Sequence, residues 1–154
     1  MKRSQMTKTM VIAALLAVGA TVVPAWAHHS FAMFDQTKTV ALSGMVYQFK
    51  PIATHAELHF YLLGPDGKLA KKDGKMVDYG VEMAGAAGMA RLGITAATFP
   101  VGTIVSVKVN PMRDGTNFGS LQSAIAKCPW KMPPAAGQGC DSVPGHELLG
   151  AKTF

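Results

Sequence analysis

Residues 37–49, TKTVALSGMVYQF, carry side chains that alternate between two faces with a period of two. That period is typical of a β-strand with one buried face. One face holds a Val-x-Leu-x-Gly-x-Val series that runs from Val40 to Val46. Gly44 interrupts the apolar side chains of this face, and there we expect a bulge or a sharp bend. The stretch therefore predicts a long first strand of a β-sheet.

Four more segments carry strand patterns, and one carries a helix pattern. HAELHFYLL at residues 55–63 places Leu58 and Phe60 on one face and Glu57 and His59 on the other. Residues 84–92 are rich in Ala and Met and are followed by Gly93, which predicts a short helix with a glycine cap. The remaining strands are predicted at residues 76–83, 103–109 and 119–127.

The order of three strands, one short helix and two strands predicts a mostly β fold. It matches the OB fold, a small five-stranded Greek-key barrel with its helix between strands 3 and 4. A closed barrel also hides the strand edges that promote aggregation. Residues 128–154 lack a regular period and predict an irregular tail after the barrel.

The first 27 residues have the composition of a secretory signal peptide. Lys2, Arg3 and Lys8 precede an apolar run that is short for a membrane span, and Ala25 and Ala27 form an A-x-A cleavage pattern. This pattern disfavours the alternative of an uncleaved N-terminal anchor. We expect a signal peptide at 1–27, an OB-like domain at 28–127, a tail at 128–154, and a periplasmic or secreted protein without a stable membrane anchor.

Composition and charge exclude two classes of protein. With 49% hydrophobic and 16% charged residues, the 154-residue chain is not intrinsically disordered. The formal net charge is +6, and cleavage would remove three basic residues and lower it to +3. So mild a charge does not indicate a nucleic-acid-binding surface.

Cys128 and Cys140 are the only cysteines, and a segment rich in Pro and Gly separates them. In an oxidising compartment two such cysteines predict a disulfide bond. A metal–thiolate site is the less favoured alternative. The chain has no C-x-x-C-H motif, so covalent haem attachment is excluded.

The N-terminal histidine is the most informative candidate ligand. Cleavage after Ala27 would give His28 a free α-amine, which with its imidazole can chelate one copper or zinc ion. The amine has a reference pKa near 8, so a metal ion displaces its proton at little cost near neutral pH. Candidate further ligands are three histidines and one thioether in an axial position: His29, His55, His59 and Met33.

The spacing of His55 and His59 limits what they can share. Four residues of regular strand separate them by roughly 13 Å, too far for one ion. A helix would bring them one turn apart near Glu57, but H-A-E-L-H is not the H-E-x-x-H motif of metalloproteases. The alternation favours the strand, and the alternative to metal binding is that both histidines face solvent, with Glu57 between them as a hydrogen-bond partner.

The chain resembles an uncharacterised family of small exported proteobacterial proteins, known as a domain of unknown function. The resemblance rests on the mature start HHSFAMFD at residues 28–35 and on the Val40 to Val46 series, and it spans roughly residues 27–127. Where that family carries Trp-x-Asn-Pro-His, this chain reads FKPIATH, so only His55 is retained. The resemblance implies an exported OB-like domain and no particular activity.

Together these features predict an exported protein that binds a metal ion, copper in preference to zinc, through the amine and imidazole of His28 with His29 or His55 as the further ligand. Its predicted role is storage, delivery or sensing of the ion. The alternative is a non-enzymatic OB-like module that binds a periplasmic protein partner or a small ligand through its second and third strands and the loops at 50–54 and 112–118. A third and less favoured hypothesis is that the protein is an oxidative copper enzyme. The chain has no G-x-S-x-G motif and no P-loop, and we assign no catalytic residue.

Overall fold

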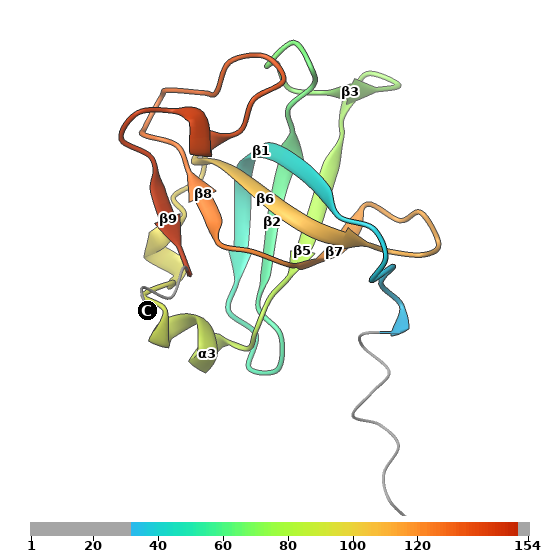
Figure 1. Ribbon diagram of the computed structural model, residues 1–154, viewed down its shortest axis with the longest axis vertical. Coiled ribbons are helices and arrows are strands. Elements are labelled where there is room, and N and C mark those ends of the chain that lie inside the picture. The colour runs from blue at the N-terminus through green and yellow to red at the C-terminus, as the bar shows by residue number, and fades with distance from the viewer. Residues whose placement is uncertain (1–31, 151–154) are drawn as a thin grey trace, which may run out of the picture. The chain divides into compact units, whose positions relative to one another are not determined.

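The computed structural model describes residues 32–150, which contain a closed five-stranded barrel (Figure 1). Its strands pair in the order β1-β2-β5-β7-β6 and return to β1, and every pair is antiparallel except β5 with β7. This order confirms the predicted Greek-key barrel of the OB type. The barrel strands are β1 (Val40–Lys50), β2 (Glu57–Leu62), β5 (Asp78–Glu82), β6 (Ile104–Pro111) and β7 (Phe118–Leu121).

The barrel closes through β1, which pairs with two neighbours over successive halves of its length. Residues 40–45 pair with β6 and residues 44–50 with β2, so Gly44 has a partner on both sides. A Cβ at Gly44 would collide with the Phe60 ring and lie 2.6 Å from the carbonyl oxygen of Tyr61. Glycine is therefore required by close approach, and the register irregularity lies further along, between Val46 and Gln48.

The predicted short helix is present between the third and fourth barrel strands. Helix α3 (Ala86–Arg91) buries Met89, and the following turn buries Ile94 and Phe99 before β6 begins. A 3-10 turn, η2 (Ala96–Thr98), lies between them. These side chains join the core with the inward residues of the strands: Val46, Leu58, Phe60, Tyr79, Val81, Val105, Val107 and Val109.

Two of the predicted strands are each divided in the structure. The predicted third strand at 76–83 is divided, because β4 (Lys75–Met76) pairs with β3 (Lys71–Lys72) in a separate hairpin. Asp73 and Gly74 turn this hairpin with positive φ angles of 52° and 77°. The predicted fifth strand at 119–127 is also divided, because β7 ends at Leu121 and β8 (Ile125–Lys127) pairs with an earlier part of β6.

The C-terminal tail bears the predicted disulfide and packs beside β6 and β8 (Figure 1). Cys128 and Cys140 are bonded, which excludes the metal–thiolate alternative. Over its described residues, 128–150, the tail lacks regular structure except for η3 (Cys140–Ser142) and β9 (Glu147–Leu149), and β9 extends the sheet by pairing with β8. Within residues 32–150, no helix has the length and apolar character needed to cross a membrane.

Gly44→Ala should destabilise the barrel by about 1 to 3 kcal/mol, because its methyl group would overlap the Phe60 ring. Urea unfolding of the two proteins measures the difference. Gly88→Ala is the matched control: it lies in α3, its Cβ would lie 3.3 Å from that of Ala84, and removing a helical glycine favours the helix. Equal stability of Gly44→Ala and wild type would contradict this account of barrel closure.

Removing the disulfide with Cys128→Ala and Cys140→Ala together should lower the free energy of unfolding by about 3 kcal/mol. The bond closes a loop with a sequence separation of 12, and chain entropy for such a loop gives a value of this size. Urea unfolding with and without reductant tests it. Wild type in reductant should match the double variant, and a reductant effect on the double variant would contradict the assignment.

Candidate functional site

The structure describes three of the five predicted metal ligands. His28 and His29 precede residue 32 and lie outside the described residues. His59 lies within β2, whereas His55 precedes the strand, which begins at Glu57 and not at residue 55 as predicted. Met33 lies just before the barrel with 44% of its surface exposed. The predicted ligands in the described part of the chain thus come from two places, the start of β2 and the entry to the barrel.

The outer face of β2 carries polar and aromatic side chains in the predicted alternation. Leu58 and Phe60 are fully buried, whereas Glu57, His59 and Tyr61 lie on the other face with intermediate exposure. Because side chains alternate along a strand, burial of the first two turns the other three away from the core. This outward set, together with its neighbours on β1 and β5, forms the candidate site.

Glu57 contacts the imidazole of His59 and the ammonium group of Lys50 on this face. Its Oε2 lies 2.8 Å from Nε2 of His59 and 3.2 Å from Nζ of Lys50, and Lys50 is its cross-strand partner on β1. The hydrogen bond with His59 is the main cause that lowers the pKa of Glu57, and Lys50 lowers it further against the opposing effect of burial. The side chain of His59 is only 14% exposed, so Glu57 holds it in a confined position.

His55 has a separate carboxylate partner. Its Nδ1 lies 3.5 Å from Oε1 of Glu82, and Glu82 is directly opposite Glu57 in the β2–β5 register. Two histidine–carboxylate pairs therefore lie next to each other at this end of the sheet. Among residues 32–150, no group of three or more His, Cys, Asp or Glu side chains is arranged to hold a metal ion. A metal ion here would need ligands from elsewhere in the chain.

A row of aromatic rings continues from His59 in both directions. On one side its ring lies 6.0 Å from that of Tyr47, which stacks on Tyr61 at 4.5 Å. On the other side lies Gly80, where a Cβ would collide with the Phe118 ring and lie 3.3 Å from Cε1 of His59. The glycine thus lets the rings of His59 and Phe118 lie over the same point of β5.

The Phe118 ring also fixes the entry to the barrel. Phe34 is fully buried and its ring stacks on Phe118 with centroids 6.3 Å apart. The backbone adds two hydrogen bonds, from Asp35 N to the Pro111 oxygen and from Arg113 N to the Met33 oxygen. Residues 33–35 are thereby attached beside the row that leads to His59.

Sequence reasoning missed this attachment and the aromatic row. Phe34 belongs to the HHSFAMFD octet, but nothing in the sequence pairs it with Phe118, more than eighty positions away in the chain. Gly80, which lies in the middle of a predicted strand, is a signal for close approach of another group. Tyr47 is the extra residue at the register shift in β1, which a regular alternation does not reveal.

Residues 15–122 match a family of unknown function, DUF6152, over more than half of the chain. The chain belongs to this family. No curated protein and no solved structure matched it in the same comparisons. The DUF6152 match spans all four candidate histidines and ends before Cys128, so the disulfide-bearing tail lies outside it. Membership in DUF6152 confirms that the chain belongs to an uncharacterised family, and this family has no known function.

The stability of this DUF6152 protein should depend on pH through Glu57. Because folding lowers the pKa of Glu57 from 4.5, its contribution is present above that value and is lost as the pH falls through the lower folded value. Glu57→Gln removes the contribution, so the gap in unfolding free energy between wild type and Glu57→Gln should narrow below pH 4.5. Urea unfolding across this pH range measures it.

Asp73→Asn is the control, because Asp73 lies at the exposed tip of the β3–β4 hairpin. The difference in unfolding free energy between Asp73→Asn and wild type should not narrow at low pH as it does for Glu57→Gln. If wild type and Glu57→Gln lose stability in parallel as the pH falls, the ionised Glu57 does not stabilise this face.

Proposed function

We propose that the protein is exported and binds copper, after removal of residues 1–27, through the amine and imidazole of His28 with His59 as a further ligand. Storage, delivery or sensing of the ion is the corresponding role. An N-terminal amine and the imidazole of the same residue close a small chelate ring, so His28 alone supplies two nitrogen donors. Copper is preferred to zinc for such a nitrogen set by the Irving–Williams order.

The hydrogen bond between His59 and Glu57 is the observation that supports this proposal. Histidines that bind metal ions usually donate their other ring N–H to a carboxylate, which fixes the tautomer and raises the basicity of the ligand nitrogen. Nε2 of His59 makes this contact with Glu57 at 2.8 Å. With the proton on Nε2, Nδ1 carries the lone pair that a metal ion needs.

The attachment of Phe34 supports the choice of His59 as partner for the N-terminal residue. Four residues lie between His29 and Phe34, and the five extended steps that join the two span at most about 17 Å. Phe34 stacks on Phe118, and Phe118 lies over Gly80 together with His59. The chain that precedes Phe34 is therefore long enough to reach the outer face of β2.

The other three candidate ligands, His29, His55 and Met33, have secondary roles in the proposed copper site. His29 is adjacent to the chelating residue, and His55 lies two residues before β2 with its Nδ1 near Glu82. The thioether of Met33 is a soft donor suited to a weak axial contact. Because His55 is more exposed than His59, 45% against 14%, we assign the main role to His59.

Copper binding should require the free N-terminus. Protein that begins at His28 and is loaded with Cu(II) should show nitrogen hyperfine structure in its electron paramagnetic resonance spectrum. A variant with one additional residue before His28 should lose that spectrum and bind copper at least about tenfold more weakly, because its amine is displaced from the chelate. Equal and weak binding by both proteins would refute the proposal.

Histidine variants locate the further ligand. His59→Ala should remove one nitrogen from the spectrum, and Glu57→Gln should weaken binding about 10- to 100-fold by releasing the His59 ring. His146→Ala is the matched control, because His146 bonds the Val143 carbonyl oxygen in the tail. If His59→Ala behaves like His146→Ala, the barrel does not take part in copper binding.

The aromatic row favours a second candidate function, a module that binds a partner or small ligand on the same face. Tyr47 and Tyr61 stack with partial exposure on β1 and β2, and the loops at 51–56 and 112–117 connect strands of the same barrel. OB folds use this face and these loops for recognition. In that case Tyr61→Ala would impair ligand binding with copper absent, and both proteins of the N-terminal comparison would bind copper poorly.

A further inference from the structure

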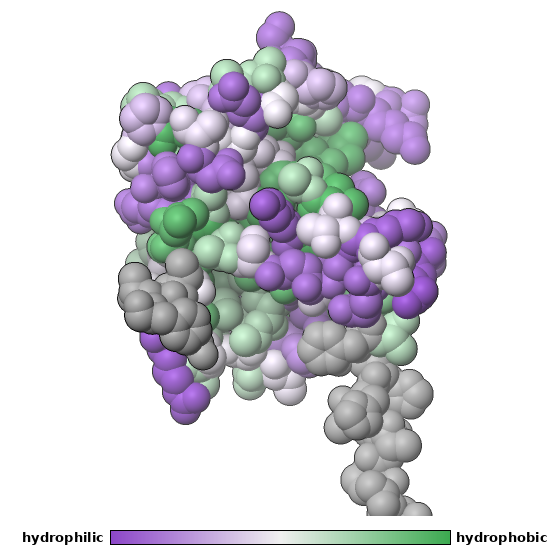
Figure 2. Space-filling view, viewed as in Figure 1, coloured by the Kyte–Doolittle hydropathy of each residue, from purple (hydrophilic) through white to green (hydrophobic). Residues whose placement is uncertain are grey.

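A second site lies on the far half of β1, away from the histidines. A pocket of about 560 Å³ lies between the outer faces of β1 and β6, the turn at 63–67 and the C-terminal tail at 134–141. Its size falls within the range of small-molecule sites. The molecular surface in the same view as Figure 1 shows green apolar residues set back among purple hydrophilic ones (Figure 2). All lining residues lie within the described part of the chain.

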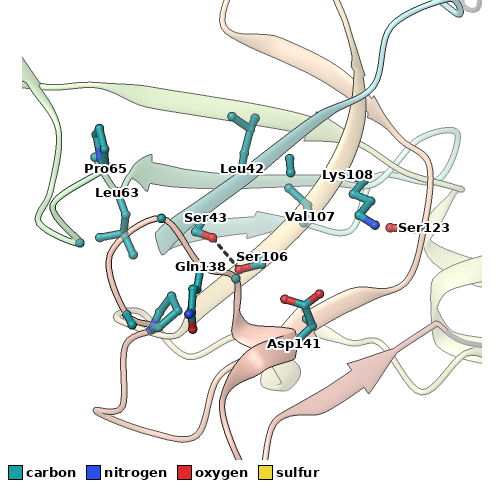
Figure 3. A pocket seen from close by; sticks show the side chains of 18 of the residues that line it. Leu42, Ser43, Leu63, Pro65, Ser106, Val107, Lys108, Ser123, Gln138 and Asp141 are labelled. Carbon is teal, nitrogen blue, oxygen red and sulfur yellow. Dashed lines mark hydrogen bonds between the residues drawn. The ribbon is translucent and has the colours of Figure 1, made fainter.

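A pair of serine hydroxyls forms the polar centre of this pocket. Ser43 and Ser106 are cross-strand partners, and their Oγ atoms lie 2.6 Å apart (Figure 3). Ser106 Oγ also accepts a hydrogen bond from Cys140 N at 2.7 Å, which ties the pair to the tail. Two hydroxyls have two protons to donate, and their mutual bond uses one. One O–H of this pair is therefore available to an acceptor inside the pocket.

Two opposite charges accompany the serine pair. Lys108 is two residues after Ser106 on the same face of β6, and Asp141 belongs to η3 in the tail. Both side chains line the pocket and are exposed, and neither has a hydrogen-bond or ion-pair partner among residues 32–150. Figure 3 shows both on one side of the Ser43–Ser106 pair.

The opposite side of the pocket is apolar. Leu63 and Pro65 lie on the other side of the serine pair from Lys108 and Asp141, and Leu42 lies above the pair in this view (Figure 3). The pocket therefore combines a cation, a hydroxyl donor and an anion at one side with aliphatic surface at the other. Pockets of this kind orient a ligand by a few polar groups and bind its body by apolar contact.

We propose that this pocket binds a zwitterion with an aliphatic side chain, an amino acid or a dipeptide. The carboxylate of the ligand accepts hydrogen bonds from Lys108 and the free serine hydroxyl, and its ammonium group pairs with Asp141. The aliphatic side chain packs against Leu63 and Pro65. Charge-assisted hydrogen bonds are the stronger kind, so the two charged contacts define the ligand class. The site is independent of copper binding.

Isothermal titration calorimetry of the full chain tests the proposal with L-leucine and with L-leucyl-L-leucine, which differ in the spacing of their charges. The same titration with 4-methylpentanoate and 3-methylbutylamine omits one charge at a time. At least one zwitterion should bind, and each singly charged analogue should bind at least about tenfold more weakly, as expected for loss of a hydrogen bond to a charged group. The proposal is overturned if neither zwitterion binds, or if a singly charged analogue binds as tightly as the zwitterion.

Substitutions locate the binding. Lys108→Met and Asp141→Asn should each weaken binding of the zwitterion by about tenfold or more. Lys71→Met and Asp114→Asn are the matched controls, because Lys71 lies on the β3–β4 hairpin and Asp114 precedes β7, and neither lines the pocket. All four side chains are exposed, so folding should be retained, which circular dichroism checks. Unchanged affinity in both pocket variants would overturn the assignment.

Discussion

The pairing of β1 with β2 and β6 is the constraint on which the rest of the structure depends. Strand β1 can pair with both β2 and β6 only because Gly44 has no side chain at the point where the Phe60 ring lies. Closure of this kind buries the inward side chains of five short strands, none of which could form a stable sheet with a single partner. It also determines which side chains face outward, because a shift of one residue would exchange the two faces.

Both candidate sites follow from this arrangement. The second half of β1 pairs with β2 and places Tyr47 and Lys50 beside His59 and Glu57. The first half pairs with β6 and places Ser43 against Ser106, where the tail adds its own residues. One strand thus supports a histidine face and a mixed polar and apolar pocket along different parts of its length. The disulfide supports only the pocket, because it holds Cys140 and the adjacent tail residues against β6.

Local patterns in the sequence were enough to predict the barrel. The two-residue period of β1 and β2, the helix that ends near Gly93, and the paired cysteines depend on neighbours in the chain or on composition. The division of the fifth strand did not follow from a pattern, because residues 122–124 break the ladder only through the way β7 and β8 pair with different parts of β6. Strand β9 likewise depends on an edge left open by β8.

The candidate site was predictable in part. The sequence identified the histidines and their outward face, and it offered Glu57 as their hydrogen-bond partner. The structure instead gives each histidine its own carboxylate, because Glu82 is opposite Glu57 across the sheet. The Phe34–Phe118 contact and the pocket join residues distant in the chain, and no periodicity reports such contacts.

The central functional claim is that copper held by the N-terminal residue also contacts the outer face of β2. Paramagnetic broadening in the NMR spectrum of processed, ¹⁵N-labelled protein during titration with Cu(II) tests it most directly. Amide signals of His59, its cross-strand partner Gly80, and Phe118 should disappear at the first additions, whereas those of Ser106 and Lys108 should persist. Broadening that spares β2, or that begins around His146, would contradict the claim.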